Sequence, residues 1–343
     1  MIKAEETRMF QEAASAAEVL RTQLRQDGGA MAALGARIRA LAPRAVITCA
    51  RGSSDHAATY AKYLIETQAR VITASAAPSV NSVYGITQDL RGCLFIAISQ
   101  SGRSPDLLAA VAAAKASGAL VLALCNSPRA PLMEAADLVI ELRAGPETSV
   151  AATKSYLATL TALARFVAAW TQNREFGAKI EALPELMERG WRADWSAALP
   201  VLEAAANLYV VGRGLGLGAA QEIALKFKET CGLHAEAFSS AEVKHGPYAL
   251  LGKNFPALLL AQQDASLEGV QSLGAELVKR EVPVLVAGTS VPGAVSLPLA
   301  PAAPELAPIL LVQSAYRLIA ELAVRRGFDP DRPPHLRKVT ETV

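Results

Sequence analysis

Two stretches of sequence decide the fold: AVITCARG at residues 45–52 and NLYVVGRG at residues 207–214. Each is an apolar run followed by Arg-Gly, and the second copy lies 162 positions after the first. The same offset relates two further pairs of apolar runs, 95–98 with 257–260 and 121–124 with 283–286. Three coincident offsets indicate that the chain contains two copies of one structural unit.

Each copy alternates short β-rich runs with helical patterns. Because the β-rich runs are apolar without period-two alternation, both faces of each strand should be buried, which indicates a parallel sheet covered by helices. Helices are expected over residues 55–68 and 105–117. The fold class is therefore α/β, with two tandem doubly wound parallel-sheet domains. In the first copy, strands are expected near residues 45–49, 71–74, 94–98, 120–124 and 138–142.

The predicted organisation has five segments. Residues 1–27 have apolar side chains at helical spacing and should form one amphipathic helix, and residues 152–190 should be helical up to Pro184. Three prolines after residue 329 prevent the helix expected over 306–327 from continuing. The segments are an N-terminal helical segment (1–30), a first domain (31–175), a helical linker (176–196), a second domain (197–328) and an extended tail (329–343).

Composition excludes several classes of protein. Of 343 residues, 52% are hydrophobic and 19% charged, which favours compact domains over disorder. A net charge of +2 gives no case for nucleic-acid binding. Charged residues interrupt the most apolar stretches, so no membrane span or signal peptide is expected. The four cysteines occur singly, as expected of buried thiols in a reducing cytoplasm, and no spacing of histidines supports a metal site.

Hydroxyl-rich and glycine-rich segments follow three expected strands of the first copy: Gly52-Ser53-Ser54, Ser99 to Ser104, and Glu147 to Lys154. Ligands of doubly wound sheets bind at these strand ends, and helix N-termini with Ser and Thr hydroxyls suit a phosphate dianion. The alternative for any one loop is an N-cap or a turn. Because the second copy has Ala261-Gln262-Gln263-Asp264 at the matching position, the sequence predicts one phosphate site per chain.

The glycine-rich run Gly212 to Gly218 follows a strand and resembles a dinucleotide-binding motif. The spacing fails, because the position of the third fingerprint glycine is Leu217. The glycines are better interpreted as residues that let a helix approach the sheet closely. No cofactor is predicted.

A helix expected over residues 219–230 carries Glu222, Lys226 and Glu229 on one face. This spacing alone favours a solvated salt-bridge face. The segment that follows, His234 to Pro247, concentrates two of the four histidines with two acids and a lysine, which favours an acid/base centre instead. His56 and His335 are isolated and are expected at the surface.

Taken together, these residues resemble the sugar isomerase (SIS) domain family, and within it the isomerase half of glucosamine-6-phosphate synthase. The likeness covers nearly the whole chain in the right order. It implies tandem SIS domains, as the repeat does. The motifs that carry it are ISQSGRS at 98–104, ETSVAATK at 147–154, ALKFKETCGLHAEAFSSAEVKHGP at 224–247 and HLRKVTETV at 335–343.

The resemblance implies a role for each matching residue. Glu229 matches the base that moves a proton between C1 and C2 of the open-chain sugar, and Lys226 a lysine close to the enediol oxygen. His245 matches a residue that assists ring opening and is supplied by the neighbouring subunit. Lys338 matches a tail lysine that forms a Schiff base with an open-chain ketose. The sugar phosphate is assigned to Ser99, Gln100, Ser101 and Ser104, with Ser54 and Val150 near the sugar and Gly52 and Ser53 in the same loop.

Some residues depart from the synthase pattern. Arg103 replaces an acid beside the phosphate, Ala152 replaces a serine, and Arg51 replaces a small residue before Gly52. The chain opens Met1-Ile2-Lys3 where the synthase has a glutaminase domain with an N-terminal cysteine, so it is expected not to take ammonia from glutamine itself.

The sequence therefore predicts a cytoplasmic homodimeric enzyme that needs no cofactor. The predicted reaction converts glucosamine 6-phosphate to fructose 6-phosphate and ammonia. Two alternatives stay open: an isomerase or deglycase of another amino-sugar phosphate, such as fructosamine 6-phosphate, and a sugar-phosphate sensor without turnover.

Overall fold

The computed structural model describes residues 2–26 and 29–338, which form two compact units. The described residues of unit 1 are 2–17, 147–157 and 182–338. Those of unit 2 lie within 18–146 and 158–181. Each unit is therefore built from segments that are not consecutive in the sequence. The five-segment division of the chain stays a prediction.

Unit 2 contains a sheet of five parallel strands in the order β2-β1-β3-β4-β5. The central strand β3 is buried along its whole length, as expected for a strand covered on both faces. This arrangement confirms the predicted doubly wound parallel sheet. The strands are β1 (Ala45–Cys49), β2 (Thr73–Ser75), β3 (Cys93–Ser99), β4 (Leu120–Cys125) and β5 (Leu138–Glu141).

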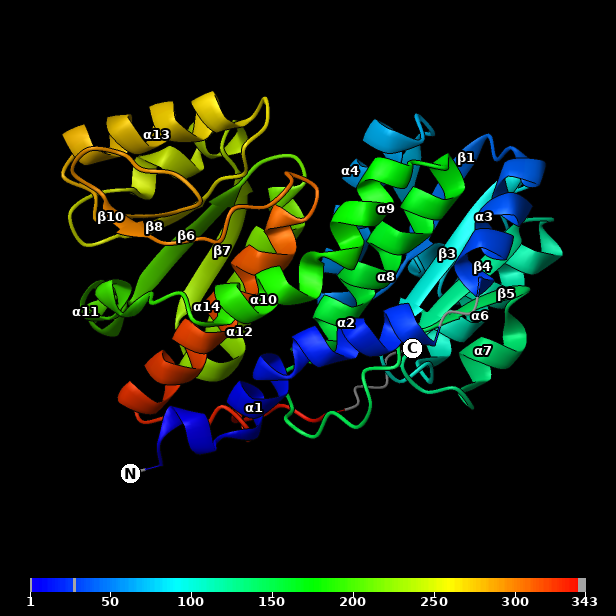
Figure 1. The fold of residues 1–343 in the computed structure, drawn as a ribbon, viewed down its shortest axis with the longest axis horizontal. Coiled ribbons are helices and arrows are strands. Elements are labelled where there is room, and N and C mark those ends of the chain that lie inside the picture. The colour runs from blue at the N-terminus through cyan, green and yellow to red at the C-terminus, as the bar shows by residue number, and fades with distance from the viewer. Residues whose placement is uncertain (1, 27–28, 339–343) are drawn as a thin grey trace. The chain divides into compact units, whose positions relative to one another are not determined.

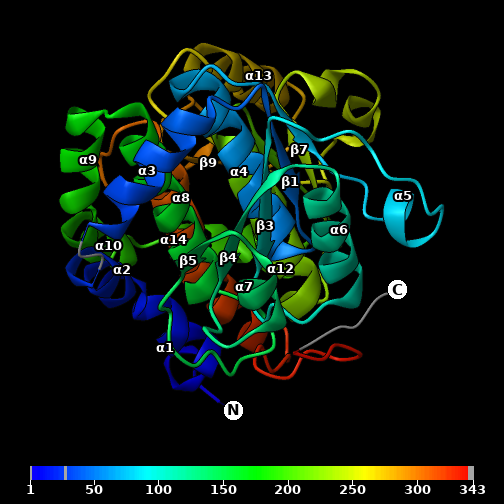
Figure 2. The ribbon, with the colours of Figure 1, turned by 90° about the vertical axis from the view of Figure 1, so that its right-hand side faces the viewer.

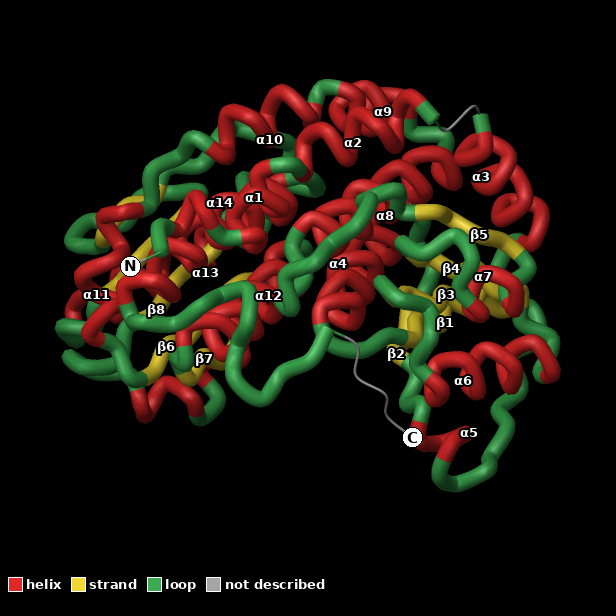
Figure 3. The backbone as a smooth tube through the Cα atoms, turned by 90° about the horizontal axis from the view of Figure 1, so that it is seen from below, coloured by secondary structure: helices red, strands yellow, loops and turns green. Residues whose placement is uncertain are grey.

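Helices cover both faces of this sheet. The helix α4 (Ser53–Gln68) lies on one face and α6 (Pro105–Ala116) on the other (Figure 2, Figure 3). Leu107 and Val111 of α6 pack in one buried cluster with Phe95 of β3. The other helices assigned mainly to this unit are α2 (Ala16–Arg25), α3 (Ala30–Leu41), α5 (Ser79–Ser82), α7 (Pro131–Ala135), α8 (Lys154–Thr171) and α9 (Arg174–Glu181).

Unit 1 contains a second parallel sheet, in the order β10-β9-β8-β6-β7. Read from the other end, this order repeats that of the first sheet, with β6 in the place of β1 and β7 in the place of β2. The internal repeat predicted from the offset of 162 positions is thereby confirmed. The strands are β6 (Asn207–Gly212), β7 (His234–Ser239), β8 (Ala257–Leu260), β9 (Val284–Ala287) and β10 (Val295–Leu297).

The strand β7 lies within the segment His234 to Pro247, where the sequence analysis expects no strand. His234–Ser239 is an edge strand that pairs in parallel with β6. Its polar residues His234 and Glu236 are exposed and Ala235 is buried between them. Half-exposure of this kind gives an edge strand a polar sequence.

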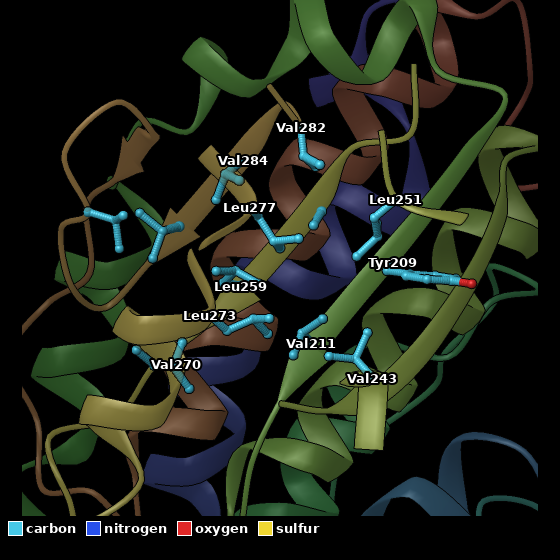
Figure 4. Packing of buried hydrophobic residues seen from close by; sticks show 14 residues of the cluster. Tyr209, Val211, Val243, Leu251, Leu259, Val270, Leu273, Leu277, Val282 and Val284 are labelled. Carbon is cyan, nitrogen blue, oxygen red and sulfur yellow. The ribbon is translucent and has the colours of Figure 1, made fainter. Parts of the chain in front are cut away.

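One buried cluster of unit 1 lies between its sheet and α13 (Leu267–Lys279). Figure 4 shows Tyr209, Val211 and Leu259 of the sheet packed against Leu273 and Leu277 of α13. On the other face of the sheet lie α12 (Gly216–Cys231) and α14 (Ala307–Arg325) (Figure 1). The short elements of this unit are η1 (Ala4–Glu6), α1 (Arg8–Ala14), η2 (Ser196–Ala198), α11 (Leu199–Ala204), η3 (Glu242–Lys244) and η4 (Pro247–Leu250).

Glycines let α12 begin close to the sheet. A Cβ atom added to Gly212 would lie 2.4 Å from the carbonyl oxygen of Gly216, and one added to Gly216 would lie 2.7 Å from Oε1 of Gln262. Neither distance leaves room for a methyl group. The interpretation of this run as a close-packing motif is confirmed.

Two helical predictions are corrected at their boundaries. Instead of one helix, the N-terminal segment forms η1, α1 and α2, and Ser15, whose hydroxyl donates to the carbonyl of Glu12 at 2.7 Å, ends α1. The region expected to be helical up to Pro184 contains α8 and α9, and Pro184 lies in the first turn of α10 (Leu183–Trp191). Proline is tolerated in the first turn because a backbone N–H at that position would have no acceptor within the helix.

The helix α14 is long and apolar enough to cross a membrane by length and composition, with a mean hydropathy of 1.4. Of that apolar window, 83% is buried inside the protein, which accounts for its composition. After α14, the described part of the tail, up to Lys338, contains neither helix nor strand, as predicted. The tail beyond Lys338 lies outside the described residues.

Candidate functional site

The charged face of α12 is buried, so the interpretation as a solvated salt-bridge face is wrong. Glu222 is fully buried and Lys226 is 1% exposed, whereas the side chain of Glu229 is 21% exposed. The helix lies against both the sheet and α14, so this face meets protein instead of water. Spacing alone could not distinguish the two environments.

These three side chains form one ion-pair cluster. Nζ of Lys226 lies 2.5 Å from Oε2 of Glu229 and 3.3 Å from Oε1 of Glu222. Burial opposes the charge of Lys226, but the two carboxylates outweigh it and raise the pKa of Lys226. The lysine is therefore a fixed cation that holds Glu229, the member of the cluster with access to solvent.

Tyr316 of α14 completes the cluster, and sequence analysis missed it. Its hydroxyl donates to Oε1 of Glu222 at 2.9 Å, and the ring is fully buried. Burial and the Glu222 carboxylate raise the pKa of Tyr316 well above its usual value, so the phenol remains a donor. Tyr316 lies in a helix of mostly apolar residues, where a single tyrosine does not indicate a site residue from the sequence alone.

Lys338 lies in the same unit and is held by two acceptors. Its Nζ lies 2.8 Å from the carbonyl oxygen of Ser149 and 3.2 Å from Oε2 of Glu147. The Glu147 carboxylate is buried and also accepts from the hydroxyl of Ser155 at 2.6 Å. Lys338 is thus bound to the Glu147 to Lys154 segment. This segment also contains Val150, the residue predicted to lie near the sugar, which is half-buried.

The same segment corrects one of the three predicted phosphate loops. The N–H and hydroxyl groups of Thr148 and Ser149 all donate to the carboxylate of Glu12, and the N–H groups of Thr153 and Ser155 donate to Glu147. Two carboxylates take these donors and would repel a phosphate. The sequence could have indicated the role of Glu12 only through its position, since it is an acid among the apolar positions of the first helix.

The other two predicted phosphate loops lie at one edge of the first sheet. Gly52, Ser53 and Ser54 follow β1 and begin α4, and the Ser99 to Ser104 loop follows β3, the neighbouring parallel strand. Their strand ends therefore meet at the same edge. Gly52 has a φ of +53°, which glycine adopts without strain. Gln100 and Ser101 are half-buried in the second loop.

The Ser99 to Ser104 loop is a rigid turn. Oγ of Ser99 accepts the N–H of Gly102 at 3.0 Å, which leaves its own hydrogen to donate to a ligand. Gly102 has a φ of +65°, and an added Cβ would lie 2.8 Å from Sγ of Cys125. Ser104 occupies the N-cap of α6 without a capping bond from its side chain. Ser99 thus holds the turn and still has a hydroxyl hydrogen to donate, and the hydroxyl of Ser104 is not used as a helix cap.

If the Ser99 to Ser104 loop binds a phosphate, as the sequence predicts, replacing Ser104 by alanine is expected to raise the Kd for a sugar phosphate about tenfold, the effect of losing one hydrogen bond to a charged group. Because the hydroxyl does not cap α6, the free energy of unfolding should change by less than about 0.5 kcal/mol. Calorimetric titration and urea unfolding measure the two quantities. The matched control is Ser117→Ala at the other end of α6. An unchanged Kd would remove Ser104 from the phosphate site.

Arg51, one of the departures from the synthase pattern, is paired within this edge. Its guanidinium lies 2.9 Å from Oδ2 of Asp106, which is 3% exposed in the first turn of α6. The ion pair neutralises Arg51 and joins the loop after β1 to the helix after β3. Arg103, in contrast, is exposed.

At the matching edge of the second sheet, Gln262, Gly288 and Thr289 line a hollow of about 580 Å³. None of its lining residues is charged. The prediction of one phosphate site per chain stays a prediction.

His245 is exposed where η3 ends, and its neighbour Lys244 pairs with Glu276 at 2.7 Å. The role of His245 stays a prediction. His335 is exposed as expected, whereas His56 is half-buried at the start of α4. The described residues contain no group of three or more His, Cys, Asp or Glu side chains that could hold a metal ion.

Comparison with known proteins identifies relatives of both halves. A model of the SIS domain family matches residues 42–169 and 202–294, which contain β1 to β5 and β6 to β9. The glutamine–fructose-6-phosphate aminotransferase (isomerizing) of Aeropyrum pernix is 34% identical over 313 residues, covering 85% of this chain and 50% of the relative. The chain spans about half the length of the curated relatives that it matches.

Two crystal structures share the fold. A candidate phosphosugar isomerase of Silicibacter pomeroyi is 36% identical, with a TM-score of 0.91 over 95% of this chain and 100% of that chain. The glucosamine-6-phosphate deaminase of Thermotoga maritima is 21% identical, with a TM-score of 0.80 over 98% of this chain and 100% of that chain. The second likeness is one of fold alone.

Proposed function

This chain belongs to the SIS domain family, and we propose that it is an amino-sugar phosphate isomerase that acts as a deaminase. The proposed reaction converts glucosamine 6-phosphate and water to fructose 6-phosphate and ammonia. The resemblance predicted from the sequence is confirmed at the level of the family, and the curated relatives named above are enzymes.

The observation that carries the proposal is the α12 cluster. A carboxylate that reaches solvent, Glu229, is held by a cation that is itself buried, Lys226. Proton transfer next to a carbonyl needs a positioned base and a nearby positive charge for the oxygen that becomes negative. This pair can supply both.

In the proposed mechanism the ring opens first, which exposes the aldehyde at C1 and the amine at C2. Glu229 removes the proton from C2, and the ammonium group of Lys226 stabilises the oxygen at C1. Glu229 then returns the proton to C1, and a second proton passes from the amine at C2 to the oxygen at C1. These transfers leave a hydroxymethyl group at C1 and an imine at C2. The amine of Lys338 attacks the imine carbon and ammonia leaves. Water hydrolyses the lysine imine, which releases fructose 6-phosphate and restores Lys338.

The phosphate is assigned to the two serine loops of unit 2. Hydroxyl and backbone N–H groups are neutral donors that bind a phosphate dianion. They add no second cation that would compete with Lys226 for the negative oxygen at C1. A phosphate anchored in this way would fix one end of the open-chain sugar. The support is that Ser99 and Ser104 retain donor capacity at the same edge of the sheet.

The decisive assay measures ammonia and fructose 6-phosphate released from glucosamine 6-phosphate, with N-acetylglucosamine 6-phosphate as a control that lacks the free amine. Release of both products from the first sugar alone supports the proposal. Calorimetric binding without release would show a sugar-phosphate sensor instead. If glucosamine 6-phosphate neither binds nor reacts, the proposed substrate is wrong.

We also propose that the active form is a homodimer in which the exposed His245 serves the neighbouring copy. Two inactive variants, Glu229→Gln and His245→Ala, are mixed after partial unfolding and refolded together. About a quarter of the sites should then contain both intact residues, and activity should return in that proportion. If His245 serves its own chain, the mixture will stay inactive.

The thiols support the proposed cytoplasmic location. All four cysteines are buried and free. Burial raises the pKa of Cys49 and of Cys231 to about 12, so both remain neutral thiols. Unpaired thiols are typical of a reducing compartment.

A further inference from the structure

We propose that Glu12, in the N-terminal helix α1, is a positioning residue for Lys338 and acts through Ser149. The inference rests on the proposed function, because it gives Lys338 a place in the reaction. Glu12 is not among the hydrogen-bond partners of Lys338, which are Glu147 and Ser149. It fixes the backbone to which Lys338 is bound.

The carboxylate of Glu12 is 9% exposed and is surrounded by donors. Oε2 accepts the hydroxyl of Ser149 at 2.7 Å and its N–H at 3.2 Å. Oε1 accepts the hydroxyl of Thr148 at 3.1 Å and the N–H of the same residue. Four donors from two consecutive residues converge on one buried carboxylate, and charge-assisted bonds of this kind are the strong ones.

Ser149 transmits this constraint to Lys338. It is fully buried, and its carbonyl oxygen accepts Nζ of Lys338 at 2.8 Å. Because the N–H and the carbonyl belong to one residue, bonds that fix the first limit the direction of the second. Glu147 supplies the other acceptor for Lys338 from the same segment, at 3.2 Å.

The tail that carries Lys338 is tied to the same helix. The carboxylate of Asp331 accepts the N–H groups of Arg8 and Met9 in the first turn of α1, both at 2.8 Å. These bonds cap the N-terminus of the helix, where a negative charge is favourable. Thus α1 holds both the tail, through Asp331, and the segment that binds Lys338, through Glu12.

Glutamine is the informative replacement for Glu12, because it keeps the size of the side chain and loses two acceptor positions. Either orientation of the amide directs its NH2 group at the donors of Thr148 or of Ser149. At least one pair of bonds must break, and the Ser149 carbonyl is then free to turn away from Lys338.

The first measurement follows Lys338 itself and needs no activity. Acetylation of the folded protein by limiting acetic anhydride is quantified by mass spectrometry, with exposed Lys253 as the internal reference. In the wild type, Lys338, with a side chain 26% exposed, should react more slowly than Lys253, which is 70% exposed. Glu12→Gln should raise the rate at Lys338 about fivefold relative to Lys253 by freeing its side chain. The matched control, Glu5→Gln in the exposed η1 turn, should leave it unchanged.

The second measurement is steady-state kinetics with glucosamine 6-phosphate. Glu12→Gln should lower kcat about tenfold with little change in KM, because misplacing a reacting amine affects the chemical steps more than phosphate binding. A merely structural role would leave the kcat of the folded fraction and the relative acetylation rate unchanged, and that result would overturn the proposal.

The outcomes separate this inference from the proposed function. If wild-type protein shows no turnover but Glu12→Gln still speeds acetylation of Lys338, the proposed reaction fails and the positioning of Lys338 stands. If Glu12→Gln does not fold, Ser149→Ala removes a single donor from the same carboxylate and is measured in the same way. Unchanged acetylation of Lys338 in that variant would also overturn the proposal.

Discussion

Replacing Glu229 by glutamine is expected to lower kcat for glucosamine 6-phosphate about a thousandfold, the usual contribution of a positioned general base. The amide keeps the shape of the side chain and can still accept from Lys226, but it cannot take a proton from C2. The KM should change little, because the phosphate is assigned to other residues. Steady-state ammonia release, together with loss of deuterium from substrate labelled at C2, measures both the overall and the proton-transfer rate.

The control for this variant is Glu268→Gln, in the exposed first turn of α13. It should keep both rates within about twofold of the wild type, as surface substitutions usually do. Near-normal exchange of deuterium in Glu229→Gln would show that another group is the base. Glu222 would then be the first to examine, since Lys226 contacts it as well.

Replacing Lys226 by methionine is expected to cost about 3–5 kcal/mol of unfolding free energy, because removal of one partner leaves a buried carboxylate uncompensated. Glu222 is fully buried, and it would keep the hydroxyl of Tyr316 as a hydrogen-bond donor but lose its cationic partner. Urea unfolding at neutral pH measures the change. Lys228→Met, two positions along the same helix and exposed, is the matched control and should change stability by less than about 0.5 kcal/mol.

The double variant Glu222→Gln/Lys226→Met distinguishes charge from packing. If the loss comes from an unpaired carboxylate, neutralising Glu222 should recover a large part of it. If the double variant is as unstable as Lys226→Met, the charge explanation is wrong and the loss is one of packing.

The pH dependence of this ion pair has a definite sign. Because the pKa of Lys226 is raised in the folded state, its contribution to stability is fully present below the ordinary lysine pKa. The contribution should be lost only as the pH rises through the raised value. The stability difference between the wild type and Lys226→Met should therefore not shrink between neutral pH and the start of lysine titration.

The fold was predictable because its signals are local. The strands of the first sheet are short apolar runs, and the repeat placed most of their counterparts in the second. The exceptions are β10, which the offset does not reach, and β7, where polar residues alternate with buried ones at a sheet edge. The alternation of polar and buried residues in β7 covers too few positions to identify a strand from the sequence. The strand becomes evident only from its pairing with β6.

The site was predictable only as far as residue types at local spacing allow. Glu222, Lys226 and Glu229 could be placed on one face of a helix, but the burial of that face depends on α14, about ninety residues later in the chain. The donors of Thr148 and Ser149 looked free for phosphate because their acceptor, Glu12, lies 136 and 137 positions away. Long-range partners of this kind leave no periodicity in the sequence.

The segments that form the two units also set the order in which the units can fold during synthesis. Every described segment of unit 2 has been synthesised once residue 181 is added, whereas unit 1 needs residues 2–17 as well as residues up to 338. Since domains generally fold during synthesis as their segments emerge, the nascent chain must keep α1, with its buried Met9 and Ala13, waiting for partners that arrive last. Unit 1 therefore cannot complete its fold around α1 until the last described residues of the chain have been made.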